Sequence, residues 1–253
     1  MTISSADYVE VIERAIARVG TTQADPVARA ADLLTATLQA GGVIQAFGCG
    51  HSEALAMEIA GRAGGLVPTN KIALRDLVLY GGEPASVLGD PELERTPSVA
   101  QRLYDLAPIK PDDAFVIASN SGVNGAVVEM ARLVKRRGHP LIAITSIAHS
   151  ARAGSRHDSG LKLADLADVV LDNGAPYGDA SLAYGSDAGV GAVGAVSSIT
   201  AALLAQQIVV EVVARLLALG VTPPVYLSDN VPGGREHNQL IEARYAGRIR
   251  RTA

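Results

Sequence analysis

Two polar segments of this chain follow apolar runs of strand length and precede helical patterns. Residues 48–52 read Gly-Cys-Gly-His-Ser, and residues 119–124 read Ser-Asn-Ser-Gly-Val-Asn. The second segment combines two hydroxyls, a glycine and the backbone N–H groups of a helix start, which together can bind an anion without a cationic side chain. A phosphate monoester would fit this arrangement. The alternative is a polar turn with Asn124 as the helix cap.

The first segment lacks the features of two common nucleotide-binding motifs. A dinucleotide fingerprint needs a third glycine where this chain has Glu53, and a Walker loop needs Gly-Lys-Ser/Thr, which is absent. The glycines could instead form a tight turn from strand to helix, with Ser52 as the cap. We therefore expect no nucleotide cofactor.

The apolar segments predict the framework that must position these loops. Four runs have strand length: 43–47, 114–118, 141–145 and 169–171. Helical patterns separate the last three, the spacing suits βαβ units, and continuous apolar strands are typical of a parallel sheet covered on both faces. Ligands bind at the carboxyl ends of such strands, where both polar segments and the pair Thr145 and Ser146 lie. The sequence therefore predicts an α/β fold.

The rest of the chain is assigned more coarsely. Residues 1–41 read as two helices that form an N-terminal arm, and a long helix is expected from about 192 to 219. Residues 66–111 are the hardest to interpret, with a strand expected around 74–80 and a helix around 97–106. We see no linker, and predict a single domain over 1–253, with an α/β core at 42–219 and a polar tail at 220–253.

Composition argues against several classes of protein. The chain has 253 residues, 22 Lys+Arg against 26 Asp+Glu, a formal charge of -4 and 48% apolar residues, which disfavours a disordered or nucleic-acid-binding protein. The single cysteine, Cys49, cannot form an internal disulfide and has no partner at ligand spacing, so no metal is expected. The N-terminus lacks the features of a signal peptide, which favours a cytoplasmic protein. The uncharged stretch 188–210 contains glycine, serine and glutamine, which fits a buried helix better than a membrane span.

These residues resemble the sugar isomerase (SIS) domain of phosphosugar isomerases and phosphosugar-binding regulators. The likeness is carried by residues 48–52, by residues 119–122 and by the order of elements from about 26 to 219. More narrowly, the chain is similar to a bacterial group of stand-alone SIS proteins, through segments 48–65, 172–179 and 223–245. The resemblance implies a three-layer αβα sandwich with a mostly parallel sheet of about five strands.

The resemblance also implies a bound sugar phosphate. The implied binding residues are Gly50, Ser52, Ser119, Asn120, Ser121, Gly122, Asn124, Thr145 and Ser146. Family members often have threonine at the position of Asn124, and glucosamine-6-phosphate synthases of the family carry threonine where this chain has His51. Asp172, Asn173 and Asp179 border the end of the fourth apolar run and could bind sugar hydroxyls.

Isomerisation needs a base that moves a proton between C1 and C2, and a second group for the hydroxyl proton. Glu58 is the candidate base, because phosphoheptose isomerases of the family place a catalytic glutamate before a similar Gly-Arg pair; Glu53, one turn earlier, is the substitute. His51 and His237 compete for the role of the acid, since imidazole titrates near neutral pH. Each of these side chains could also be an ordinary solvated or paired group.

Three functions stay open at this point. The first is an aldose-ketose isomerase acting on a sugar phosphate, amino sugars included. The second is a lyase resembling N-acetylmuramic acid 6-phosphate etherase, in which a similar base would eliminate a C3 ether. The third is a phosphosugar sensor without catalysis, which would act through a protein partner because residues 1–41 are too short and too acidic for a DNA-binding unit. We also expect a homodimer, with the tail near His237 completing the pocket of the neighbouring copy.

Overall fold

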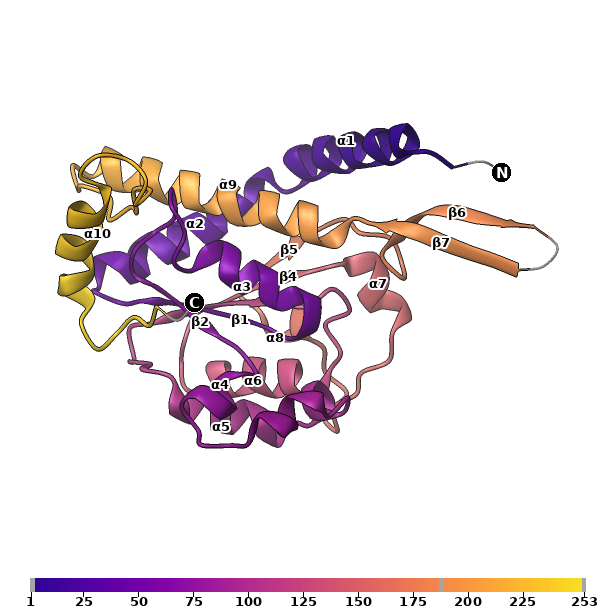
Figure 1. The fold of residues 1–253 in the computed structure, drawn as a ribbon, viewed down its shortest axis with the longest axis horizontal. Helices are drawn as coiled ribbons and strands as arrows, with labels where there is room; N and C mark the ends of the chain where they lie inside the picture. The colour runs from indigo at the N-terminus through magenta and orange to yellow at the C-terminus, as the bar shows by residue number, and fades with distance from the viewer. Residues whose placement is uncertain (1–2, 187–188, 252–253) are drawn as a thin grey trace.

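The centre of the molecule is a parallel sheet. The structure, a computed structural model, describes residues 3–186 and 189–251 (Figure 1). All neighbours in the five-stranded sheet are parallel, in the order β2-β1-β3-β4-β5. The strands are β1 (Ile44–Gly48), β2 (Thr69–Ile72), β3 (Ala114–Ala118), β4 (Leu141–Thr145) and β5 (Val169–Asp172). This confirms the predicted five-stranded parallel sheet.

Helices cover both faces of the sheet, and each face has its own apolar core. One core contains α2 (Ala24–Gln39), α3 (Glu53–Ile59) and α9 (Ser197–Ala218). The other contains α4 (Asp76–Leu79), α5 (Ser98–Leu106), α6 (Gly125–Arg136) and α8 (Leu163–Leu166). Strand β3 alternates between them, because Val116 packs in the first core and Phe115 and Ile117 in the second. The predicted three-layer αβα sandwich is therefore confirmed (Figure 1).

Two elements extend beyond the three layers. Helix α1 (Ser5–Thr22) and an antiparallel hairpin, β6 (Ala180–Ser186) with β7 (Gly189–Ala195), project from the same end of the body (Figure 1). They contact each other, because the Tyr8 ring packs against Gly194 and its hydroxyl donates to the carbonyl of Ala195. The hairpin was not predicted from the sequence.

The hairpin corrects the predicted start of the long helix. Residues 192–195 belong to β7, and the helix begins at Ser197. The physical reason is the glycine content of this stretch, since Gly194 adopts a positive φ of 82° that does not continue a helix. Ala188, within the uncharged stretch, lies outside the described residues. Among the described helices, α9 alone is long and apolar enough to cross a membrane, and its buried face packs in the core beside α2 and α3.

The segment 66–111 holds a strand at a different place from the predicted one. The strand is β2 at 69–72, whereas 76–79 form α4, so the expectation of a strand over 74–80 was wrong. The Asp76 carboxylate accepts a hydrogen bond from the Ala73 N–H and closes a turn there. Two 3-10 turns follow, η2 (Ala85–Gly89) and η3 (Leu93–Arg95), and α5 confirms the helix expected around 97–106.

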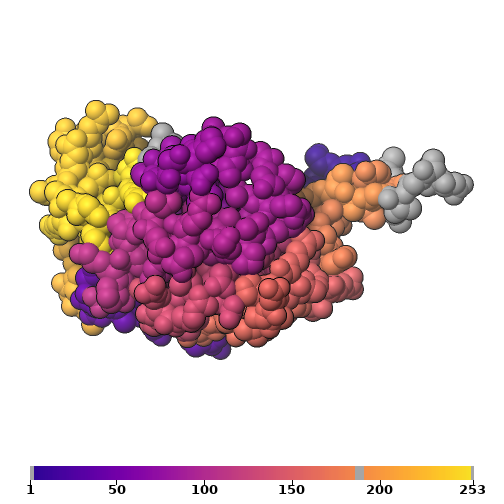
Figure 2. Space-filling model, turned by 90° about the horizontal axis from the view of Figure 1, so that it is seen from below, coloured from indigo at the N-terminus to yellow at the C-terminus, as the bar shows by residue number. Residues whose placement is uncertain are grey.

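The C-terminal segment is folded onto the body. It contains α10 (Gly234–Glu242) and the turn η4 (Ala243–Tyr245). Its last residues contact β2 and the residue that precedes β3. The Arg250 N–H donates to Asn70 Oδ1 at 2.7 Å, and the Arg248 guanidinium pairs with the buried Asp113 carboxylate. Figure 2 shows this yellow segment at the end of the molecule opposite to the orange hairpin.

Candidate active site

A cavity of about 300 Å³ opens where the carboxyl ends of β1, β3 and β5 meet the start of α9. Its walls come from α3, from the loop after β3, from the segment after β5 and from the first turns of α9. The polar side chains that line it are His51, Ser52, Glu58, Ser119, Asn120, Asn173, Asp179, Ser197 and Ser198. The fold therefore brings together the first five of these, which were predicted catalytic or phosphate-binding residues, with Asn173 and Asp179, which were candidates for binding sugar hydroxyls.

The loop after β1 makes an abrupt turn from strand to helix. A Cβ on Gly48 would lie 2.3 Å from the carbonyl oxygen of Ser52, so only glycine fits there. The turn continues through η1 (Gly50–Ser52) into α3. Ser52 makes no capping hydrogen bond through its side chain, contrary to the expected cap, and lines the cavity instead.

The loop after β3 is held by hydrogen bonds that order its backbone. Ser119 Oγ accepts from the Gly122 N–H at 3.1 Å, and Gly122 has a φ of 67°. The carbonyl of Asn120 accepts from Thr145 Oγ1 at 3.2 Å, and its side-chain oxygen accepts from Asn173 Nδ2 at 3.1 Å. Asn120 is therefore oriented by the ends of two neighbouring strands before any ligand arrives.

Several predicted binding residues lie behind or beside the cavity. Thr145 and Ser146 are buried and brace the loops, Ser146 by donating to the carbonyl of Ala175 at 2.7 Å. The remaining ones are not among the lining residues: Gly50, Ser121, Gly122 and Asn124. Asn124 stands at the start of α6 without a capping bond, which corrects the capping alternative.

Glu58 lines the cavity, and one of its carboxylate oxygens is anchored by hydrogen bonds. Its Oε1 accepts from Gln206 Nε2 on α9 at 2.7 Å and also pairs with Arg62 one turn later. Among the described residues, none donates a hydrogen bond to Oε2. Glu53 lies outside the lining and pairs with Arg75 at 3.0 Å and Lys71 at 3.9 Å. The geometry favours Glu58 over Glu53 as a base.

The two candidate acids are far apart. His51 is exposed and lines the cavity, whereas His237 sits on α10, at the opposite end of the molecule from the hairpin (Figure 1). Its Nε2 lies 3.0 Å from the carbonyl of Val225. Within one chain, only His51 can reach a ligand in the cavity.

Other histidines have fixed partners. His139 is buried, with Nδ1 donating to the carbonyl of Asp113 at 2.9 Å and Nε2 accepting from the Tyr104 hydroxyl at 2.7 Å. His149 Nδ1 lies 3.3 Å from the amide nitrogen of Asn120, behind the loop after β3.

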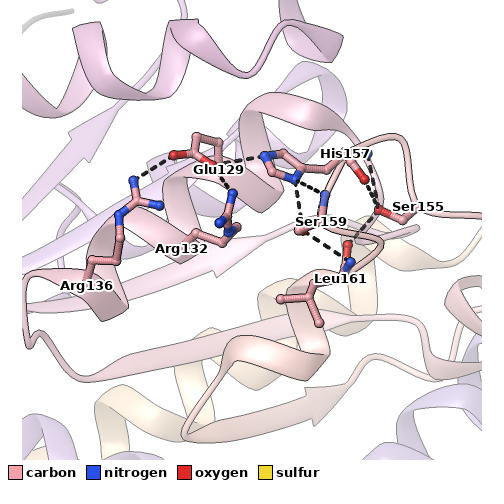
Figure 3. Close-up of polar contacts among 7 residues, drawn as sticks. All are labelled: Glu129, Arg132, Arg136, Ser155, His157, Ser159 and Leu161. Atoms are coloured by element: carbon pink, nitrogen blue, oxygen red, sulfur yellow. Dashed lines mark hydrogen bonds and ion pairs between the residues drawn. The ribbon is translucent and has the colours of Figure 1, made fainter.

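The segment 153–162, which follows α7 (Ile147–Arg152), is fixed on α6 by His157 (Figure 3). The Ser159 N–H donates to His157 Nδ1 at 3.1 Å, so the ring proton is on Nε2, which donates to Glu129 at 2.9 Å. Burial by itself raises the pKa of Glu129, but the hydrogen bonds from Arg136 and His157 together with the charges of Arg136 and Arg132 outweigh it and leave the pKa lowered. These contacts hold the neighbouring Arg156 beside the start of α6.

Asp179 has a structural role that was not predicted from the sequence. Its Oδ1 accepts from the N–H groups of Val196 at 3.0 Å and Ser197 at 2.8 Å, and its Oδ2 accepts from Ser197 Oγ at 2.6 Å. Its φ of 65° makes it the sole non-glycine residue with a positive φ in the described ranges 3–186 and 189–251. Asp179 thus joins the base of the hairpin to the start of α9. The Gly178-Asp179 pair was the available turn signal.

The same described residues contain no group of three His, Cys, Asp or Glu side chains placed to hold a metal ion. Asp172, the last residue of β5 and one of the three candidates for binding sugar hydroxyls, uses its Oδ1 to accept from the N–H groups of Ile147 and Gly174. The polar groups of the cavity are therefore hydroxyls, amides, one imidazole and two carboxylates.

Comparisons with known proteins agree with this architecture. A family model described as "SIS domain" matches residues 7–146. The UPF0309 protein lmo0025 of Listeria monocytogenes is 42% identical over 228 residues, which cover 90% of this chain and 91% of that protein. The UPF0309 protein TTE0306 of Caldanaerobacter subterraneus is 35% identical over 244 residues, which cover 96% of this chain and 98% of that protein.

Two solved structures share the fold at low sequence identity. A phosphoheptose isomerase from Francisella tularensis aligns with a TM-score of 0.56 and 17% identity, covering 83% of this chain and 98% of that chain. The phosphoheptose isomerase GmhA from Neisseria gonorrhoeae aligns with a TM-score of 0.53 and 21% identity, covering 83% and 96%.

Proposed function

This chain belongs to the SIS-domain family, with UPF0309 proteins as its relatives, and from this premise we propose that it isomerises a phosphorylated sugar between its aldose and ketose forms. The observation that carries the proposal is that Glu58, Ser52 and Ser119 line one cavity at the carboxyl edge of the sheet. The fold it has in common with two phosphoheptose isomerases supports the same class of substrate.

The phosphate is assigned to the two loops that precede α3 and α6. The hydroxyls of Ser52 and Ser119, which line the cavity, donate to its oxygens, and the dipole of α6 adds positive potential beside them; Ser121, on the same loop but outside the lining, is not needed for this arrangement. Charge-assisted hydrogen bonds of this kind are about twice as strong as neutral ones. The sugar carbons then extend into the cavity toward Glu58 on α3.

The proton transfers use the free oxygen of Glu58. Glu58 Oε2 takes the proton from C2 of the open-chain aldose, the C–H electrons form a C1=C2 double bond, and the carbonyl oxygen at C1 gains a proton from His51. His51 then takes the proton of the C2 hydroxyl, a carbonyl forms at C2, and Glu58 returns its proton to C1. The bonds to Gln206 and Arg62 hold the carboxylate at one position through both steps.

We also propose that two copies of this chain associate. Helix α9 exposes an uncharged stripe that contains Ile199, Val210 and Leu217, and the hairpin exposes Tyr184 and Val193. Exposed apolar side chains that lie along one helix face are typical of an interface with a partner. A second copy brings its own tail, so His237 remains a candidate group for the neighbouring cavity. Sedimentation velocity at micromolar concentration is expected to give a dimer, and a monomer alone would contradict this part.

The test of the function is a binding screen followed by an exchange assay. Thermal shift with paired free sugars and sugar 6-phosphates should give stabilisation by the phosphates alone, because a ligand at a hundred times its Kd adds about 2.7 kcal/mol. The stabilising sugar is then incubated in D2O, and loss of the C2 proton signal is followed by NMR. Glu58→Gln should abolish exchange, whereas Glu53→Gln on the same helix should retain it.

The same assay separates the alternatives. A lyase of the etherase type would release the C3 substituent instead of a ketose, and a sensor would bind the sugar phosphate without any exchange. The isomerase proposal fails if no sugar phosphate stabilises the protein while phosphate-free sugars do.

A further inference from the structure

The side chain of Asn124, at the start of α6, is held between two opposite charges. Its Nδ2 donates to Glu94 Oε1 at 2.9 Å, and its Oδ1 accepts from Arg156 Nη1 at 3.3 Å. Neither charged residue belongs to the two polar loops: Glu94 comes from η3 and Arg156 from the segment after α7. The amide that was expected to bind phosphate is therefore already occupied.

The Glu94 carboxylate lies between the two loops. Its Oε2 is 3.4 Å from the position that a Cβ on Gly50 would take, so it also touches the loop after β1. Burial, and then the nearby charges of Glu94 and Glu53, raise the pKa of the Cys49 thiol, which places the negative potential of Glu94 at the end of β1. A carboxylate thus fills the space between the loops that a ligand phosphate would bridge.

The backbone of η3, which contains Glu94, packs directly against the first turn of α6. A Cβ on Gly125 would lie 2.1 Å from the carbonyl oxygen of Arg95, so the η3 segment and the first turn of α6 are in direct contact. Anions are favoured at a helix N-terminus because the dipole and the unpaired N–H groups are positive there. The Glu94 carboxylate is such an anion, and it is supplied by the protein itself beside the start of α6.

Arg156 is the complementary charge on the other side of Asn124. Its backbone N–H donates to the carbonyl of Val123 at 3.0 Å, and the adjacent His157 is fixed to Glu129 on α6 (Figure 3). Within residues 3–186 and 189–251, the Arg156 guanidinium donates a hydrogen bond to Asn124 Oδ1 and forms no ion pair. A guanidinium held in this way can pair with phosphate through two parallel hydrogen bonds.

We propose that Glu94 is a built-in competitor for the phosphate site and that Arg156 is the cation that receives the phosphate. On binding, the phosphate takes the hydrogen bond of Asn124 from Glu94 and pairs with Arg156. The inference rests on the proposed sugar-phosphate function and goes beyond it, because it assigns two charged residues that set affinity in opposite directions.

The test measures the affinity of four single variants for two probes. Isothermal titration uses the sugar 6-phosphate that gives the largest thermal shift, and separately inorganic phosphate. Glu94→Gln keeps an acceptor for Asn124 but removes the charge, and Arg156→Gln removes the cation. Glu92→Gln, two residues before Glu94, and Arg137→Gln, at the opposite end of α6, are the matched controls with the same charge changes.

Opposite shifts are expected for the two test variants. One unit charge roughly 5 Å away changes binding by about fourfold at the dielectric constant of water and by a few hundredfold at an effective constant of about 20, so about tenfold lies between these limits for exposed groups. Glu94→Gln should therefore bind both probes about tenfold more tightly, Arg156→Gln about tenfold more weakly, and the controls should stay within about twofold of the wild type. Unchanged melting temperatures verify that the variants are folded.

The possible failures are distinguishable. If the wild type binds the sugar phosphate but Glu94→Gln binds it equally or more weakly, the inference is overturned and the proposed function stands. If no sugar phosphate binds any variant while inorganic phosphate binds Glu94→Gln more tightly than the wild type, the function fails and the inference stands. If neither probe binds the wild type or Glu94→Gln, both are overturned.

Discussion

Replacing the buried Asp113 with asparagine should destabilise the protein more than any surface substitution. The Asp113 side chain is completely buried, and four donors converge on it. Oδ1 accepts from the Val43 N–H at 2.9 Å and pairs with Arg248, and Oδ2 accepts from Gln45 Nε2 at 2.9 Å and the Lys110 N–H at 3.0 Å. One carboxylate thereby joins β1, the start of β3 and the C-terminal segment.

The magnitude follows from what an amide at this position cannot do. An asparagine side chain would keep one acceptor oxygen, but its NH2 group would face two donors, from Gln45 and Lys110, and the Arg248 charge would lose its partner. Leaving a buried donor unsatisfied costs about 1–3 kcal/mol, and removing one member of a buried ion pair costs about 3–5 kcal/mol. Because these costs overlap, we expect Asp113→Asn to lower the free energy of unfolding by about 3–5 kcal/mol.

Urea unfolding followed by circular dichroism measures this loss. The comparison variant is Arg248→Met, which removes the other member of the same ion pair but leaves Asp113 with three backbone or amide donors, so the expected loss is smaller than that of Asp113→Asn. The reasoning is refuted if Asp113→Asn changes the free energy of unfolding by under about 1 kcal/mol, or if Arg248→Met costs more than Asp113→Asn. An altered m-value would point to a changed unfolded state instead.

Three further outcomes are expected. Since the native contacts lower the pKa of Glu129, its stabilisation is present above the usual glutamate pKa and is lost as pH falls through the lower native value. Glu129→Gln should therefore melt below the wild type at pH 7, and the difference in Tm should narrow as the pH is lowered below the usual glutamate pKa; a difference that does not narrow would contradict this. Because burial foremost raises the pKa of Cys49, the native protein should not react with an aromatic disulfide reagent at pH 8 until urea unfolds it; rapid native labelling would disprove this. Asp179→Ala should cost about 1–2 kcal/mol in urea titrations, as for a lost helix cap, and Asp179→Gly less because glycine accepts the positive φ; the reverse order would contradict the role of the backbone.

Strands β3 and β4 could be predicted from the sequence because they are continuous apolar runs, whereas β2, which reads Thr-Asn-Lys-Ile, was not found. The runs 114–118 and 141–145 match β3 and β4 residue for residue, since these strands are buried on both faces and Thr145, at the end of β4, is their one polar residue. The hairpin could not be found in the same way. Its small apolar residues merge with those of α9, so the hydrophobic pattern shows no boundary, and only the spacing of Gly191 and Gly194 marks a change of structure.

The loop residues of the candidate site could be predicted from the sequence, but the side chains that contact them could not. The topology of a parallel sheet places the ends of β1 and β3 at one edge, so Ser52 and Ser119 were expected to meet, and they do. The partners Glu94 and Arg156 come from irregular segments, and Gln206 comes from the predicted long helix, whose apolar pattern does not indicate that this residue contacts Glu58. Their positions depend on tertiary packing, which neither periodicity nor motif spacing encodes.

The position of α9 in the chain affects how the protein is made on the ribosome. All five strands of the sheet have been synthesised by residue 172, but one face then has α2 and α3 alone to cover it until residues 197–218 follow. At about 5–20 residues per second, this gap lasts a few seconds. The nascent chain therefore exposes an apolar sheet face for that time. The helix that covers this face, α9, also supplies the last wall of the cavity. A chain interrupted before α9 would depend on chaperones and would be unable to bind its ligand.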